Sequence, residues 1–407
     1  MWLRIKIAFR NAFRNRRRSL LNIFMIASAV AAIVVFEGFT HNMISGLRET
    51  TVQTQTGHLQ LALRNFWEKK SNKPKQNLIK SYQIVVTELL KDKRIQYAAG
   101  KLEFFGLLSK GDESMSVRII TLDPQKEVSR NKHFRFREGK ALHKNRPFQV
   151  AVGNGLARKL GLKSNSNVSI LTHTYDGVVN AMDFEVSGIF QTDIAEFDDS
   201  TLLMPLRTAQ ELLDTTAVEQ IVVGLKSSWD TTMVKDSVRA VLAGIDPDIQ
   251  VKTWYQIATL YKQVSMFNRV QNTMVQFILM ALVLLSIMNT VGMSILERTG
   301  EIGTIRALGE KRAAVVFQFL MEGLFLGLGG VLLGILGAIC IAKGFNAMNI
   351  PIIFPGASAP IFIKIEVLYS AILKASLLGL GITILAAVIP AHRASKMNIV
   401  EALRYNI

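Results

Sequence analysis

The residues with the clearest chemical pattern lie in a short charged segment, 296–309, between two long apolar stretches. Residues 274–296 carry no charge, and residues 313–342 are apolar apart from Gln318 and Glu322. A membrane span needs about 20 apolar residues, so both flanks are predicted to cross a bilayer. The charged segment must then lie at one membrane face. Its mixed charges offer a docking surface for another protein, although an ordinary charged loop is the simpler explanation.

Within this segment the spacing predicts an amphipathic helix. Ile302, Ile305 and Leu308 recur every three residues, and charged residues occupy the other face. Gly309 is placed to end the helix as its C-cap. Two glutamates four residues apart cost roughly 0.3 kcal/mol, which Arg298 or a basic groove on a partner would offset. The candidate contact residues are Glu297, Arg298, Glu301, Ile302, Ile305, Arg306, Leu308 and Gly309.

Residue types that could perform catalysis show no comparable pattern. The histidines of residues 41–265 lack the spacing of metal ligands, and no nucleophile-elbow or zinc-protease motif occurs. Residues 106–111 resemble half of a phosphate-binding loop, but Asp112 and Glu113 follow where a lysine and a hydroxyl are needed. The sequence therefore predicts that the chain is not an enzyme and holds no cofactor or metal.

Composition predicts a membrane protein with a soluble domain. Of 407 residues, 49% are hydrophobic, and they are concentrated in four stretches. The net charge is +17, and residues 1–18 contain seven basic residues and no acid. This cluster directly before an apolar stretch follows the positive-inside rule, so no nucleic-acid partner is expected. The single cysteine, Cys340, lies in an apolar stretch, so cysteine usage does not decide the compartment of the soluble domain.

The distribution of basic residues predicts that both chain ends are cytoplasmic, because the short segments on that side carry more Lys and Arg than the short loop opposite. The first span is expected to remain as an uncleaved anchor, since no small-residue cleavage site follows it. The predicted order is a basic N-terminus (1–18), a first span (19–40), an extracytoplasmic domain (41–265), a stalk and second span (266–296), the charged segment (297–312), a third span (313–342), an outer loop (343–365), a fourth span (366–390) and a C-terminal segment (391–407).

The domain at 41–265 mixes strand and helix signals, which predicts an α/β domain. The fold class is therefore membrane α+β: four transmembrane helices with a large extracytoplasmic domain between the first and second. The β-rich runs are 116–122, 149–152, 168–171, 183–190 and 220–225, and the helical ones are 155–160, 205–213 and 231–243. Asp176 and Gly177 give a hairpin-turn signal. A plain hairpin is the simpler expectation, but its tip could contact a partner through Tyr175, Asp176, Gly177 and Val178.

The spans contain residues suited to helix packing. Two glycine pairs of the third span have the spacing that lets helices approach closely: Gly323 with Gly327, and Gly330 with Gly334. The polar side chains of the second span are expected to face other helices, although the same atoms could line a cavity. Lys374 is expected to reach the outer headgroups, and Glu37 to lie at the outer interface or in a water-filled cleft.

A family resemblance follows from these motifs. Residues 287–309, IMNTVGMSILERTGEIGTIRALG, and 319–323, FLMEG, resemble the FtsX/MacB-type (type VII) ABC transporter permeases. The ending PAHRAS at 390–395, with EALR at 401–404, is similar to the C-terminal signature of that family. The resemblance implies that the charged segment is a coupling helix seated on a cytoplasmic ABC ATPase dimer, which would bind ATP and Mg²⁺. It also implies a second permease chain, identical or different, an α/β core at 41–120 and 206–265, and a β-rich insertion at 121–205.

The layout is most similar to that of the lipoprotein-releasing permeases LolC and LolE. A fused ATPase, as in the MacB exporters, is not expected, and the outer domain is larger than in the cell-division members. This similarity implies a place in the bacterial inner membrane and extraction of lipoprotein, or another amphiphile, by mechanotransmission. Membrane lipids and a periplasmic carrier are the further partners it suggests. Tripartite efflux of peptides or antibiotics, and a signalling role in activating an extracytoplasmic enzyme, remain alternatives.

Overall fold

The computed structural model describes residues 2–68, 74–127, 134–143, 145–227, 230–352, 361–398 and 402. The chain divides into two compact units. Unit 1 comprises Met1–Ser45, Val264–Pro351 and Phe362–Ile407, and unit 2 comprises Gly46–Gln263 and Ile352–Ile361. Parts of the predicted outer loop (343–365) and of the predicted C-terminal segment (391–407) lie outside the described residues.

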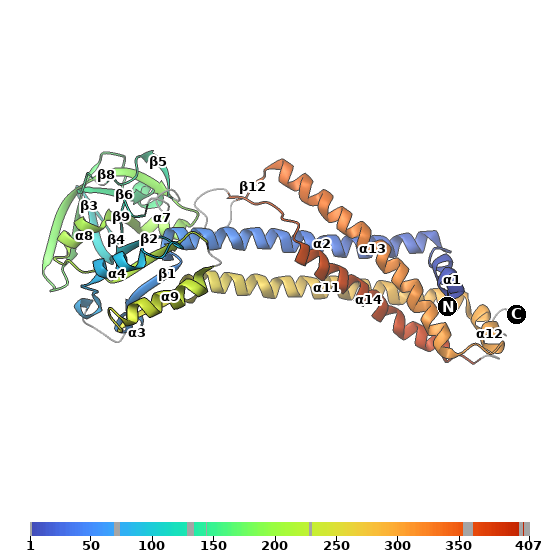
Figure 1. Ribbon diagram of the computed structural model, residues 1–407. Helices are drawn as coiled ribbons and strands as arrows, with labels where there is room; N and C mark the ends of the chain where they lie inside the picture. Colours follow the sequence, from blue (N-terminus) through green and yellow to red (C-terminus); the bar gives the residue numbers. More distant parts are fainter. Residues whose placement is uncertain are drawn as a thin grey trace. The chain divides into compact units, whose positions relative to one another are not determined.

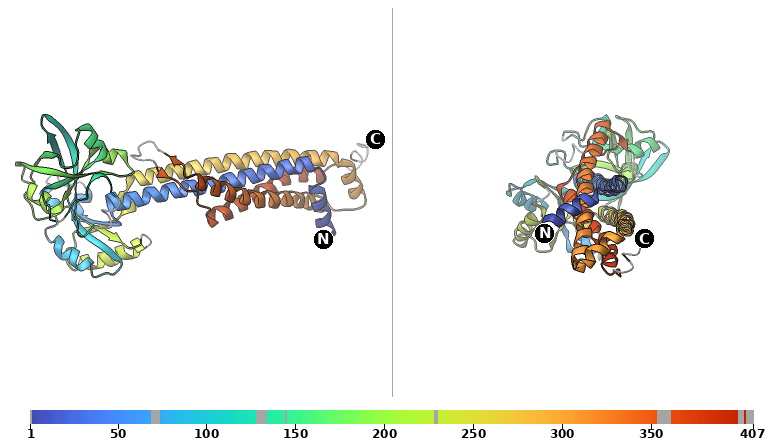
Figure 2. Two further views of the ribbon diagram at one scale, coloured as in Figure 1. Left: turned by 90° about the horizontal axis from the view of Figure 1, so that it is seen from above. Right: turned by 90° about the vertical axis from the view of Figure 1, so that its right-hand side faces the viewer.

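Within these described ranges, four helices are long and apolar enough to cross a membrane (Figure 1). They are α2 (Arg16–Thr50), α11 (Thr259–Glu297), α13 (Arg312–Met348) and α14 (Tyr369–Ser395). The short α1 (Trp2–Ala12) precedes α2, and α12 (Thr299–Ala307) separates α11 from α13. In Figure 2, as in Figure 1, α13 and α14 lie side by side within unit 1. The predicted multi-pass membrane protein is confirmed.

Three of these helices, α2, α11 and α13, are much longer than a membrane span requires. At 1.5 Å per residue, the 39 residues of α11 extend roughly 58 Å, about twice the hydrocarbon thickness of a bilayer. The predicted stalk and second span therefore form one helix, and the predicted first span covers only part of α2. Helix α14 continues through Pro390 to Ser395, so the first residues of the predicted C-terminal segment are helical.

Glycines of α13 set its packing in unit 1. A methyl group on Gly327 would lie 2.6 Å from Thr383 Oγ1 of α14, and one on Gly330 would lie 2.5 Å from Cβ of Ile26 of α2. Only glycine permits such close helix contact. Each predicted pair packs against a different neighbour: Gly323 and Gly327 against α14, and Gly330 and Gly334 against α2.

Two polar pairs join the spans within unit 1. Thr290 Oγ1 of α11 donates to Asn22 Oδ1 of α2 at 3.1 Å, as expected for polar residues that face other helices. Lys374 Nζ lies 3.4 Å from Glu37 Oε2. The sequence did not predict this pair, in which the Glu37 carboxylate balances the charge of Lys374.

Among the residues that the structure describes, unit 2 contains two large β-sheets. The first is antiparallel and has the order β11-β1-β10-β2, from β1 (Leu59–Leu63), β2 (Ile95–Lys101), β10 (Gln220–Leu225) and β11 (Ile249–Thr253). Helices α4 (Tyr82–Leu89) and α9 (Thr231–Ala243) contribute Val85, Leu89, Val234 and Val238 to its apolar core. Three short helices complete this part: α3 (Arg64–Glu68), the 3-10 helix η2 (Pro74–Asn77) and α10 (Trp254–Ile257).

The second sheet closes on itself. Its order is β5-β8-β6-β9-β4-β3-β7, and β7 also pairs with β8, so six strands form a barrel and β5 adds to β8. Closure leaves the six barrel strands without an open edge between them. The strands are β3 (Glu103–Lys110), β4 (Glu113–Leu122), β5 (Arg135–Gly139), β6 (Gln149–Gly153), β7 (Asn167–His173), β8 (Val179–Gln191) and β9 (Thr201–Pro205).

The barrel begins earlier than the family resemblance implied. The predicted β-rich insertion started at residue 121, but β3 and β4 already belong to the barrel. The division falls at Leu102, where the chain leaves β2 of the first sheet and enters β3. The remaining short elements are α6 (Asn154–Lys159), α7 (Ala195–Ser200), α8 (Leu206–Leu212), β12 (Pro351–Ile352) and β13 (Ile361–Phe362).

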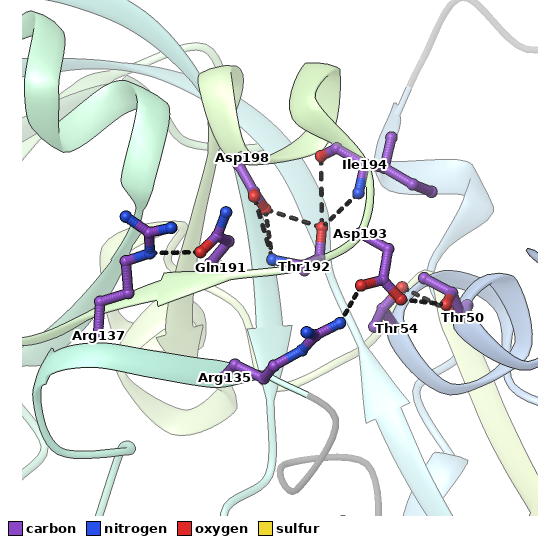
Figure 3. A network of polar contacts seen from close by, with 9 residues as sticks. All are labelled: Thr50, Thr54, Arg135, Arg137, Gln191, Thr192, Asp193, Ile194 and Asp198. Carbon is purple, nitrogen blue, oxygen red and sulfur yellow. Dashed lines mark hydrogen bonds and ion pairs between the residues drawn. The ribbon is translucent and has the colours of Figure 1, made fainter. Parts of the chain in front are cut away.

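A polar network joins the first residues of unit 2 to the barrel (Figure 3). Helix α2 continues as the π-helix η1 (Thr51–Thr56), and Thr50 Oγ1 donates to Asp193 Oδ2 at 2.8 Å. The other carboxylate oxygen of Asp193 pairs with Arg135 of β5. In the neighbouring helix α7, Asp198 accepts hydrogen bonds from the backbone N–H and the hydroxyl of Thr192. The end of α2 is thus held to the barrel by side chains as well as by the chain itself.

Candidate functional site

The charged segment forms α12, and a distinct backbone feature marks each of its ends. Arg298, with φ −118°, interrupts the helix between α11 and α12. At the other end Gly309 adopts φ +95°, and the N–H groups of Gly309 and Glu310 donate to the carbonyls of Arg306 and Ile305 at 3.1 and 3.3 Å. This is the Schellman arrangement, so the predicted glycine C-cap is confirmed. The predicted start at residue 297 is wrong, because α11 includes that residue.

Helix α12 has one face buried in unit 1 and one face exposed. Ile302 is 5% exposed, whereas Ile305 is 39% exposed and Leu308 is 83% exposed. The expectation that all three form one apolar face is therefore wrong. A spacing of three residues falls short of a helical turn, so from Ile302 to Leu308 the direction shifts by roughly 120°. The first side chain points into unit 1, and the last points away from it.

A buried ion pair fixes the start of α12 to α13. Arg298 Nη1 lies 2.9 Å from Glu322 Oε1, and both side chains are less than 10% exposed. The same guanidinium donates from Nε to Glu301 Oε2 at 3.1 Å and lies over the ring of Phe319. Breaking such a pair leaves a buried charge uncompensated, which costs about 3–5 kcal/mol. This pair is the strongest polar anchor of α12.

Exposed ion pairs connect the same segment to the beginning of the chain. Arg14 Nη1 lies 2.8 Å from Glu301 Oε1, and Arg18 Nη2 lies 2.7 Å from Glu297 Oε1. The hydrogen bond from Arg14 lowers the pKa of Glu301, which keeps this carboxylate ionised. Exposed pairs of this kind contribute only about 0–1 kcal/mol each. They orient α12 rather than determine its stability.

The structure divides the predicted contact residues into two groups. Arg298 and Ile302 are buried, and Glu297, Glu301 and Arg306 are bonded inside unit 1, the last through the carbonyl of Ser395. Ile305, Leu308 and Gly309 lie on the exposed side. Sequence reasoning missed the internal partners Arg14, Arg18 and Glu322. The basic, acid-free run at 1–18 could have predicted the ion pairs, because Glu297 and Glu301 carry the opposite charge.

The hairpin tip at 174–178, between β7 and β8, has the turn that the sequence predicts. Gly177 adopts φ +86° and donates its N–H to the Thr174 carbonyl at 2.9 Å. Tyr175 donates its hydroxyl to Glu219 Oε1 at 3.1 Å, and Asp176 pairs with Lys75 at 2.6 Å. Burial and the neighbouring Glu219 raise the pKa of Tyr175. Of the four predicted contact residues, Val178 is the one with a large exposed apolar side chain, at 64%.

The fold and the α12 segment define the class. The chain is a multi-pass membrane protein with an α/β domain after its first span and a charged helix between its second and third. Residues 19–241 match the MacB-like periplasmic core domain, and residues 273–399 match the FtsX-like permease C-terminal family. The chain therefore belongs to the FtsX/MacB-type ABC transporter permeases.

Relatives of known name extend this similarity. An uncharacterised ABC transporter permease of Methanocaldococcus jannaschii is 24% identical over 409 residues, which cover 98% of this chain and 97% of that protein. The lipoprotein-releasing system transmembrane protein LolC of Neisseria meningitidis is 25% identical over 63% of this chain and 65% of its own. The macrolide export ATP-binding/permease protein MacB of Nitrobacter winogradskyi is 27% identical over 62% of this chain and 38% of its own.

Proposed function

We propose that this chain is the permease subunit of an ABC transporter and that α12 docks on a separate ATPase dimer. In this proposal both termini and α12 are cytoplasmic, unit 2 is extracytoplasmic, and a second permease chain completes the complex. The ATPase binds ATP and Mg²⁺, and the permease converts its movement into work on the far side of a bacterial inner membrane.

The two-sided arrangement of α12 is the observation that carries this proposal. On one side the Arg298–Glu322 pair and Ile302 fix the helix to the spans. On the other side Leu308 is 83% exposed at the end of the helix, where a partner could cover it. Burying a leucine side chain contributes about 2 kcal/mol to an interface. A rigidly held helix with a bare apolar end is suited to transmit force.

The long helices support a mechanical role. Helices α2 and α11 each exceed the thickness of a bilayer, and the glycine contacts of α13 pack the spans closely. Thr50, at the end of α2, is bonded through Asp193 to Arg135 of β5. Movement of this end of α2 would therefore act directly on the barrel. We propose mechanotransmission, in which substrate is handled outside the membrane centre rather than passed through it.

For the substrate we propose a lipoprotein or another amphiphile drawn from the outer leaflet, with a periplasmic carrier as its acceptor. The similarity to LolC over 63% of this chain supports this choice. The similarity to MacB over 62% of the chain is equally extensive, so export of a macrolide-like small molecule is the second candidate.

Reconstitution of the permease with its ATPase in proteoliposomes tests both parts of the proposal. With a lipoprotein in the bilayer, ATP should drive its release into solution. Leu308→Asp should abolish release and stimulated ATP hydrolysis together. Met348→Asp, which alters an exposed residue at the other end of α13, should leave both intact. Export of a macrolide without lipoprotein release would favour the second candidate, whereas full activity of Leu308→Asp would contradict the docking role of α12.

A further inference from the structure

A basic hollow lies where α1, α2, α11 and α13 meet in unit 1. It encloses about 520 Å³ and is lined by five arginines and two glutamates, with the hydroxyls of Thr290 and Ser294. Three of these arginines are committed to carboxylates, namely Arg14, Arg18 and Arg298. The structure pairs neither Arg16 nor Arg17 with a carboxylate among the residues that it describes. The hollow therefore keeps a positive charge that suits an anion.

An apolar groove begins one turn beyond these two arginines. It encloses about 640 Å³ between α2 and α13 and includes Leu20, Phe24 and Gly337. Leu20 follows Arg16 by four residues and Phe24 follows it by eight, so the three side chains lie on one face of α2. Leu20 is 64% exposed and Phe24 is 69% exposed. A ligand that satisfied both features would be an amphiphile with an anionic head and an apolar tail.

Helix α1 has the character of a helix that lies at a membrane surface, which would place this end of unit 1 at the headgroups. Its Ala8 and Ala12 are buried, and the Phe9 ring packs edge to face on Phe325 of α13 at 5.2 Å. Ile7, Phe9 and Phe13 remain between 37% and 53% exposed beside Lys6 and Arg10. A short basic helix with exposed aromatic and aliphatic side chains is typical of helices that lie in the interface between headgroups and acyl chains.

We propose that Arg16 and Arg17 bind the phosphate of an anionic phospholipid and that one acyl chain of this lipid lies in the groove between α2 and α13. The hydroxyl of Ser294, which also lines the hollow, is placed to contact the headgroup. Free phosphate could satisfy the arginines but would leave the apolar groove uncovered, so the two features together identify a lipid. The site requires only that α2, α11 and α13 span a membrane, and it does not depend on the proposed ATPase or substrate.

Native mass spectrometry of the full-length chain in mild detergent tests this site, with phosphatidylglycerol and phosphatidylcholine of the same acyl chains as probes. The double variant Arg16→Gln/Arg17→Gln should raise the Kd for phosphatidylglycerol about thirtyfold, since each arginine near an anionic lipid contributes about a factor of five. The Kd for phosphatidylcholine should change little. The matched control Lys311→Gln/Arg312→Gln removes the same charge from exposed residues outside the hollow and should have no such effect.

A groove variant separates a lipid from a free anion. Gly337→Leu would fill the groove and should weaken binding of both lipids without affecting the arginines. Excess inorganic phosphate should not displace phosphatidylglycerol. The proposal is overturned if the control weakens phosphatidylglycerol binding as much as Arg16→Gln/Arg17→Gln does. It is equally overturned if phosphate displaces the lipid and Gly337→Leu has no effect.

Discussion

Helix α12 and the hairpin tip at 174–178 were both predicted as contact sites from residue type, but they differ in which side chains remain exposed. In α12 the charged residues are satisfied inside unit 1, and apolar Ile305 and Leu308 are left exposed. In the hairpin tip the aromatic residue is satisfied internally, because Tyr175 bonds to Glu219, and Asp176 pairs with Lys75.

The difference shows that a charged or aromatic residue on a surface segment is not by itself a contact residue. Its partners inside the chain decide whether it remains available. In α12 the internal bonds fix the helix to unit 1 and leave its apolar end exposed. In the hairpin tip the internal bonds engage the side chains of Tyr175 and Asp176, which could otherwise have bound a partner. We therefore expect changes in α12 to affect coupling and changes around the hairpin to affect the stability of unit 2.

The largest effect is expected at the buried pair of α12. Arg298→Ala leaves the Glu322 carboxylate buried without its cation, which should cost about 3–5 kcal/mol of unfolding free energy and uncouple ATP hydrolysis. Thermal unfolding of the reconstituted complex and stimulated ATPase activity measure the two results. The double variant Arg298→Met/Glu322→Met should recover most of the stability but not the coupling. Equal stability of Arg298→Ala and Arg312→Ala, which changes an exposed arginine, would refute the anchor.

The next largest effect is expected in unit 2, at the carboxylate of Glu103, the first residue of β3. Burial raises the pKa of Glu103, but the charges of Lys101 and Arg118 outweigh it and lower the pKa to about 2. A depressed pKa means that the unfolded state binds the proton first, so this stabilisation is complete above pH 4.5 and is lost as the pH falls towards 2. At neutral pH Glu103→Gln should cost up to roughly 3 kcal/mol.

Urea unfolding of the full chain between pH 2 and 6 measures this contribution. The wild type and Glu103→Gln should converge at the acidic end of the range. Glu113→Gln removes an exposed carboxylate from the neighbouring strand β4 and should track the wild type throughout. A constant difference between wild type and Glu103→Gln at every pH would mean that the ion pairs do not set the pKa.

A smaller loss is expected at the tip itself. Tyr175→Phe removes the hydroxyl that bonds Glu219 and leaves this half-buried acceptor with one partner fewer, at a cost of about 1 kcal/mol. Transport should be unchanged, because the hydroxyl already has an internal partner. Tyr255→Phe, at a half-exposed ring of α10, is the matched control. Lost transport with unchanged stability would show instead that the hairpin tip is the contact site.

The smallest effect belongs to the exposed pair between Arg14 and Glu301. Arg14→Gln should cost about 0.5 kcal/mol at low salt, and less at high salt because solvent ions screen the pair. Glu301→Lys should lower the unfolding free energy further, since it places a cation beside both Arg14 and Arg298. We expect it to uncouple ATP hydrolysis while membrane insertion stays normal. If Arg14→Gln lowered the unfolding free energy equally at low and high salt, this result would argue against a surface ion pair.

Local patterns predicted much of this structure. The four spans, the turn at Gly177 and the cap at Gly309 depend on apolar length and on glycine, which neighbouring residues reveal. The ion pair of Arg14 with Glu301 joins residues 287 positions apart, so it follows only from the tertiary structure of unit 1, in which α1 packs against α13. The inward direction of Ile302 likewise depends on which face of α12 meets α13. The start of the barrel at β3 was missed because pairing, not composition, assigns a strand to a sheet.

Site-specific cross-linking tests the docking of α12 most directly. Cys340 is the single cysteine, so a Cys340→Ser background allows one probe at a time. With a short bifunctional reagent, Leu308→Cys should cross-link to the ATPase subunit, and Ile302→Cys, at a buried position, should not. Failure of Leu308→Cys to cross-link in an assembled complex that hydrolyses ATP would contradict the proposal that this helix carries the coupling.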